Sequence, residues 1–283
     1  MKAVFVFCEG NHDVTFVARS LGQVPKMTWV GDPIGKLPSP LGPVPDPANP
    51  TRPKIESLIA KRYSSRTLDD LNLKAAAHAP LPAFETIVKA NDTIYVLIRC
   101  HGDGAAEAAI VLVSDMKAVL NPAFGTDIKE FATAFLLDAD SSLSAREAAF
   151  AKEYADLLGA AGAPTHGTWV KGKDIPVGLY VFHNTTTKSG TLEEILAPLV
   201  QVEWPTRWAA ADTYLAAHVV ADEPISKKSA ERLKAQITVT GQFRTPGDPM
   251  TTVLADRKWG LPGKHFSGPE STALVTFLQG APW

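Results

Sequence analysis

Cysteine is scarce in this sequence, with Cys8 and Cys100 as the two cysteines of a 283-residue chain. Two cysteines cannot build the disulfide framework that stabilises many small secreted proteins. Each of them ends an apolar run, so we expect both to be buried, reduced thiols. The cysteine content is therefore typical of a protein from a reducing compartment.

Excess charge of one sign and long apolar runs are also missing. The formal net charge is -2, so bulk charge neither predicts disorder nor provides a basis for nucleic-acid binding. A nucleic-acid partner would need a local basic surface or a metal. No apolar stretch reaches the roughly 18 residues of a membrane helix, and the run from Ala3 to Phe7 is too short for a signal-peptide core. We expect a cytoplasmic protein with no part in a membrane.

Apolar residues make up 45% of the chain, enough for a large core, and they occur in short runs. Runs typical of strands buried on both faces lie at 3–8, 93–100, 131–137 and 178–182. Segments with helical spacing of apolar residues alternate with them, at 13–21, 105–120, 145–158 and 191–200. Because this alternation is typical of βαβ units, we predict an α/β fold with a mostly parallel sheet flanked by helices.

Two stretches fall outside this alternation. Residues 32–53 hold eight prolines and cannot form a helix or a central strand, so we predict an extended insertion there, with a helix over 55–66 after it. From about residue 204, helical patterns at 208–220, 226–236 and 271–278 replace the strands. We therefore divide the chain into an α/β domain over 1–200 and a helical extension over 201–283 that packs on it.

Acidic residues follow the predicted strands at the end where open parallel sheets bind their ligands. They are Glu9 and Asp13 after the first strand, Asp138 and Asp140 after the third, and Glu193 after the fourth. Residues two apart on a strand point the same way, so the Asp-x-Asp pair could reach one ion if the strand geometry persists. Convergent carboxylates repel one another unless a cation joins them. Oxygen ligands without a Cys or His cluster favour Mg²⁺ or Mn²⁺.

Each acid also has a structural explanation. The acid that opens the first helix could be its N-cap. Thr191 and Glu194 match a capping box, which would leave Glu193 as the freer carboxylate of its pair. The glutamate that closes the first strand is harder to explain, because a charge at the end of an apolar strand needs a partner or a function. We interpret His12 as an ordinary polar residue at the rim of the site.

Three segments resemble a known family. The segment Phe7-Cys8-Glu9-Gly10-Asn11-His12-Asp13 resembles the Glu-Gly-x-x-Asp opening motif of the Toprim fold, which topoisomerases, primases, ribosomal-RNA maturases and OLD-type nucleases share. The segment Phe135-Leu136-Leu137-Asp138-Ala139-Asp140 resembles its second motif, an apolar strand that ends in Asp-x-Asp. Residues 190–196 are similar to the Gly-x-Leu-Glu segment of small stand-alone bacterial Toprim-like proteins related to the OLD nucleases. Residues 234–235 and 246–250 also resemble the C-terminal region of that family.

The resemblance implies a Mg²⁺- or Mn²⁺-dependent phosphodiesterase that acts on DNA or RNA. The positions that match the family's metal ligands are Glu9, Asp13, Asp138, Asp140 and, less closely, Glu193. The family's glutamate also serves in proton transfer, and Lys234 matches a basic residue near the phosphate, so both are candidate catalytic residues. OLD nucleases usually carry an ATPase domain that this sequence lacks, so a partner ATPase could supply it.

Two alternatives remain beside the nuclease. Ser142 stands where topoisomerases carry a third acid, and no tyrosine is placed as a strand-passing nucleophile, so we do not expect DNA relaxation. A phosphatase of the haloacid-dehalogenase type would use Asp138 as nucleophile and Asp140 as acid/base. That motif normally comes first in its sheet, and it leaves Glu9 without a role. The other alternative is a Toprim scaffold that binds nucleic acid or a partner protein without catalysis.

Overall fold

The structure is a computed structural model that describes residues 1–24, 28–29, 83–90, 92–100, 106–119, 128–218, 220, 229–242, 250–255 and 260–283. The proline-rich insertion predicted at 32–53 and the helix predicted at 55–66 lie outside these residues. None of the described helices has the length and apolar character that a membrane crossing requires.

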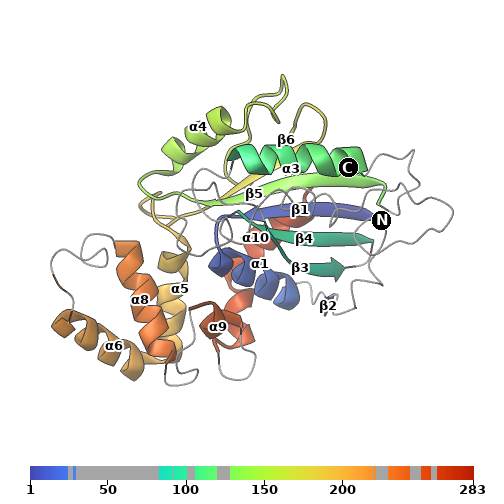
Figure 1. The fold of residues 1–283 in the computed structure, drawn as a ribbon. Helices are drawn as coiled ribbons and strands as arrows, with labels where there is room; N and C mark the ends of the chain where they lie inside the picture. Colours follow the sequence, from blue (N-terminus) through green and yellow to red (C-terminus); the bar gives the residue numbers. More distant parts are fainter. Residues whose placement is uncertain are drawn as a thin grey trace, which may run out of the picture.

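A seven-stranded sheet in the order β2-β3-β4-β1-β5-β7-β6 forms the centre of the molecule (Figure 1). Its strands are β1 (Lys2–Cys8), β2 (Thr28–Trp29), β3 (Ala83–Ala90), β4 (Thr93–Arg99), β5 (Glu130–Asp138), β6 (Thr168–Lys171) and β7 (Pro176–Phe182). The four central strands, β4, β1, β5 and β7, are parallel. At the edges, β3 pairs antiparallel with β4, β2 with β3, and β6 with β7. The predicted mostly parallel sheet is confirmed.

Helices cover both faces of the sheet. One face carries α1 (Asn11–Gln23), α5 (Leu192–Glu203), α9 (Met250–Ala255), the short 3-10 helix η3 (Gly263–Ser267) and α10 (Pro269–Gln279). The other face carries α3 (Ala106–Val119) and α4 (Leu143–Glu153). Figure 1 shows α3 on the opposite side of the sheet from α1. The remaining helices, α6 (Pro205–His218) and α8 (Ser229–Gly241), pack beside α5. The α/β fold with flanking helices and a helical C-terminal region is as predicted.

The side chains of β1 explain its unbroken apolar run. Successive strand residues point to opposite faces, so Val4, Val6 and Cys8 enter the core layer of α1, whereas Ala3, Phe5 and Phe7 enter the layer of α3. Both layers are buried, and every one of these residues must be apolar. Cys100 lies in the layer opposite to that of Cys8. Both cysteines are buried and free, as predicted.

The C-terminal segment shares the core of the sheet. Buried side chains of α9 and α10 lie in the same apolar layer as those of α1. Arg19 of α1 is buried and donates hydrogen bonds to the carbonyl oxygens of Ala255 at 3.1 Å and Leu261 at 2.9 Å. Its guanidinium also lies 4.6 Å from the ring centroid of Phe266. These contacts join α1 to the end of the chain, and the domain boundary placed at residue 200 falls inside α5.

Candidate functional site

The carboxyl ends of β1 and β5 bring two of the acids together. The strands pair in parallel with Cys8 opposite Leu136, so Glu9 directly after β1 lies beside Asp138, the last residue of β5. The backbone N–H of Asp138 donates to Oε2 of Glu9 at 3.2 Å. This is the sheet edge at which the sequence places the site.

Asp13 stands in the first turn of α1 and faces the same edge. Its Oδ2 accepts a hydrogen bond from the backbone N–H of Gly10 at 2.7 Å. Gly10 is the N-cap of the helix, so the prediction that Asp13 itself could be the N-cap was wrong. It caps the helix from the third helical position instead. Burial, with smaller contributions from the charges of Glu9 and Glu193, raises the pKa of Asp13 to about 8, although the Gly10 hydrogen bond and the charge of Lys234 act in the opposite direction. At neutral pH this acid needs a proton or a cation.

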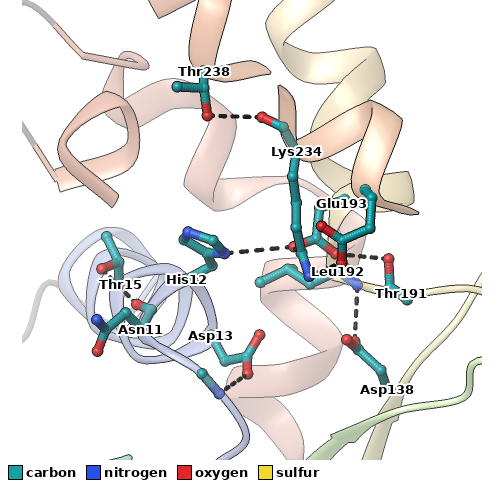
Figure 2. Close-up of polar contacts among 12 residues, drawn as sticks. Asn11, His12, Asp13, Thr15, Asp138, Thr191, Leu192, Glu193, Lys234 and Thr238 are labelled. Atoms are coloured by element: carbon teal, nitrogen blue, oxygen red, sulfur yellow. Dashed lines mark hydrogen bonds and ion pairs between the residues drawn. The ribbon is translucent and has the colours of Figure 1, made fainter. Parts of the chain in front are cut away.

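Asp138 is held by the start of α5. Its Oδ1 accepts a hydrogen bond from the backbone N–H of Leu192 at 2.9 Å (Figure 2). Burial, then the charges of Asp13 and Glu9, raise the pKa of Asp138 well above its usual range, although the Leu192 N–H acts in the opposite direction. Asp138 and Asp13 are therefore two acids that disfavour each other's ionisation.

Glu193 is the most engaged acid of the group, with 3% exposure. The hydroxyl of Thr191 donates to its Oε2 at 2.7 Å, and its Oε1 lies 3.5 Å from His12 Nδ1 and 3.8 Å from Lys234 Nζ (Figure 2). Burial opposes ionisation, but the hydrogen bonds from His12 and Thr191 and the charge of Lys234 together lower the pKa of Glu193. The prediction that Glu193 is the freer carboxylate was wrong. Thr191 is the N-cap of α5, but its hydroxyl bonds to Glu193 instead of closing a capping box with Glu194.

Lys234 brings α8 to the site. Its ammonium lies 3.3 Å from Oε1 of Glu231 as well as near Glu193. Burial lowers the pKa of Lys234, but the charges of Glu193, Glu231 and Asp138 more than compensate, so the net shift is upward. Figure 2 shows its side chain extending from α8 toward Glu193 and the Leu192–Asp138 hydrogen bond. The basic residue predicted near a phosphate therefore lies among the acids.

Asp140 does not continue the strand. Its φ is 50°, in the left-handed region, and its backbone N–H and C=O pair with those of Gly190 at 2.9 and 2.7 Å. The residue is exposed. The strand ends at Asp138, so strand geometry does not point the side chain of Asp140 in the same direction as that of Asp138. The binding of one ion by both residues stays a prediction.

The chemistry of these side chains fits a hard divalent cation. Glu9, Asp13 and Asp138 offer carboxylate oxygens, which Mg²⁺ and Mn²⁺ prefer, and a cation would relieve the repulsion that raises two of the pKa values. Within the part of the chain that the structure describes, no three acidic, histidine or cysteine side chains stand close enough together to hold a metal ion. Each of these three acids accepts a backbone hydrogen bond, so side-chain rotations would be needed to bring their oxygens around a cation.

Comparison with known proteins does not assign the chain to a family. No family model matches the chain, and no curated protein matches it. Among solved structures, a hypothetical protein from Pyrococcus horikoshii OT3 superposes with a TM-score of 0.45 and 13% sequence identity, over 99% of this chain and 95% of that chain. A likeness this weak carries no argument about fold or function. The resemblance to Toprim proteins rests on the motifs in the sequence.

Proposed function

We propose that the chain is a metal-dependent phosphodiesterase acting on DNA or RNA, with Glu9, Asp13 and Asp138 as its acidic site. The supporting observation is electrostatic. Acids from the β1–α1 connection and from the end of β5 lie near one another at one edge of the sheet, and burial together with repulsion raises the pKa of Asp13 to about 8. Strongly perturbed acids gathered in this way are typical of functional sites. A net charge of -2 does not attract a negatively charged nucleic acid. A cation bound at this site would provide the attraction.

The chain's own residues have distinct roles in this proposal. Mg²⁺ or Mn²⁺, held by Asp13, Asp138 and Glu9, would polarise the phosphodiester and activate a water. Glu9 is 22% exposed, so it can exchange a proton with bulk water and assist proton transfer. Glu193 positions Lys234, whose positive charge would face the phosphate. Asp140 would be an outer ligand at the exposed rim. A cytoplasmic location and a partner ATPase belong to the same proposal.

The test is a cleavage assay on labelled DNA and RNA with Mg²⁺ or Mn²⁺. It compares the wild type with Glu9→Gln and Asp138→Asn. We expect metal-dependent cutting that falls by at least about 100-fold in both variants, as for the loss of a proton-transferring or metal-binding group. Glu130→Gln is the matched control, because Glu130 is an exposed glutamate at the opposite end of β5. Cutting that persists in both site variants would contradict the proposal.

Two other outcomes identify the alternatives. Metal binding by wild-type protein without turnover of any polymer would indicate a Toprim scaffold. Hydrolysis of small phosphate esters through a phosphorylated Asp138 would indicate a phosphatase of the haloacid-dehalogenase type.

A further inference from the structure

A cation other than Lys234 also lies beside the acidic site. Arg146, the fourth residue of α4, places Nη2 4.0 Å from Oε2 of Glu9, and its side chain is 14% exposed. The same oxygen of Glu9 accepts the backbone N–H of Asp138. The guanidinium is therefore separated from the centre of the site by one carboxylate. The acids thus have a cation from α8 next to Glu193 and a cation from α4 next to Glu9.

The first turn of α4 is anchored at this edge of the sheet. The backbone N–H of Leu143 donates to the carbonyl oxygen of Lys188 at 2.7 Å. Glu147, next to Arg146 in sequence, accepts a hydrogen bond from the backbone N–H of His166 at 2.7 Å. These bonds tie the helix to the loop after β7 and to the segment before β6, so the fold fixes the backbone position of Arg146. A fixed cation is what a substrate-binding group requires.

The chemistry of arginine suits a phosphate at this position. A guanidinium is planar and presents several N–H donors in the geometry that matches two phosphate oxygens. A cation bound among Glu9, Asp13 and Asp138 would draw the charge of Glu9 toward itself. Arg146 would then face the phosphate that the cation attracts.

We propose that Arg146 binds a substrate phosphate on the α4 side of the acidic site and so sets the position of the polymer. The inference rests on the proposed function. It predicts that loss of the guanidinium weakens polymer binding and changes the salt dependence of that binding. The affinity for metal should change less.

The experiment measures binding of short labelled DNA and RNA oligonucleotides over a series of KCl concentrations, with Ca²⁺ in place of Mg²⁺ to slow cutting. It compares the wild type, Arg146→Gln, Arg146→Lys and Lys152→Gln. Lys152 is the matched control, because it is an exposed cation at the other end of the same helix. We expect Arg146→Gln to weaken binding about tenfold and to reduce the slope of log affinity against log salt by about 1. Arg146→Lys should keep the slope and lose part of the affinity, and Lys152→Gln should change neither.

Mn²⁺ affinity by calorimetry and the thermal unfolding temperature, measured on the same proteins, distinguish the other outcomes. If Arg146 only neutralises Glu9, Arg146→Gln will change the Mn²⁺ affinity or the unfolding temperature and leave the salt slope unchanged. That result would overturn the inference and leave the proposed function standing. If Arg146→Gln does not fold, an unchanged affinity in Arg146→Lys overturns the inference. A wild type that binds Mn²⁺ but no polymer would overturn both.

Discussion

Among single residues, Asp13 carries a charge that its surroundings disfavour. Its pKa is raised from 3.8 to about 8, so the carboxyl group of Asp13 binds its proton more tightly in the folded state than in the unfolded state. A raised pKa contributes stability below about pH 3.8, and that contribution is lost as the pH rises through about 8. The metal-free protein is therefore expected to lose stability from this residue between mildly acidic and alkaline pH.

Asp13→Asn should remove this loss, because the amide oxygen can still accept the Gly10 N–H without carrying a charge. We expect the metal-free variant to unfold at a higher temperature than the wild type at about pH 8, with the difference shrinking toward about pH 4. Added Mn²⁺ should stabilise the wild type more than the variant. Thermal unfolding in EDTA and in Mn²⁺ measures both effects. A variant that is less stable than the wild type at every pH would show that Asp13 is mainly a capping residue.

His166 gives the opposite dependence on pH. Its Nδ1 accepts the backbone N–H of Val181 at 3.0 Å, and its ring lies edge-on to that of His183 with centroids 4.6 Å apart. Burial, then the charges of His183 and Lys188, lower the pKa of His166 from 6.5 to about 4. A lowered pKa means that its contribution to stability is complete above about pH 6.5 and is lost as the pH falls through about 4.

His166→Asn should therefore flatten the acid limb of the stability curve, because the amide oxygen can accept the same hydrogen bond and does not titrate. We expect the unfolding temperature to fall less between about pH 7 and about pH 4.5 in the variant than in the wild type. Circular dichroism melts over this range measure the difference. His218→Asn, at an exposed histidine near the end of α6, is the control and should follow the wild type. Identical curves for all three proteins would refute the assignment.

At the scale of secondary-structure elements, the attachment of α1 to the C-terminal segment depends on Arg19. Arg19→Met keeps the apolar part of the side chain but leaves the carbonyl oxygens of Ala255 and Leu261 without this donor. We expect a loss of about 3 kcal/mol in the free energy of unfolding, since hydrogen bonds to a charged group are each worth about 1.5–3 kcal/mol. Arg232→Met, which breaks the exposed pair with Asp212, should lose less than about 1 kcal/mol. Urea denaturation compares them, and equal losses would contradict the role given to Arg19.

The central strands could be predicted from sequence, and the edge strands could not. A strand that is buried on both faces must be apolar at every position, as in β1, so it forms a recognisable run. The strands that were missed, β2, β3 and β6, complete the two edges of the sheet. β6 has exposed or half-buried residues throughout, so it lacks such a run. The short helix α9 was missed as well, because six residues are too few to show a helical period.

Part of the acidic site could be predicted in the same way. Glu9 and Asp138 could be identified from the sequence because each ends an apolar run. Parallel pairing of the two strands then places them side by side. The contacts of Glu193 could not be predicted, because they depend on the side-chain directions in three different helices. The left-handed backbone of Asp140 was not predicted, because positive φ is uncommon in residues other than glycine even though aspartate adopts it more often than most. Arg146 was missed for a related reason: an arginine in a helix is typical of a solvated face.

At the scale of the whole molecule, the site is assembled from segments far apart in the chain. The first strand and helix contribute residues 9–13, and β5 contributes Asp138. Glu193 comes from α5, and Lys234 comes from α8 in the helical C-terminal region. Lys234 reaches Glu193 only when α8 packs against α5. The C-terminal helices are therefore part of the proposed site as well as of the core. A destabilised attachment of this region, as in Arg19→Met, should lower activity as well as stability.

The two thiols on opposite sides of the sheet have a practical consequence. Burial raises the pKa of Cys100 to about 12, with smaller contributions from Glu9 and Asp13, and burial also raises the pKa of Cys8 well above its usual range. Neither sulfur forms a reactive thiolate near neutral pH, and the sheet between them prevents them from meeting. To a maleimide dye the folded protein should therefore behave as if it had no cysteine. One cysteine introduced at the surface of α4 or α8 can carry a fluorophore while both native cysteines stay in place, and the approach of a polymer can then be followed in real time.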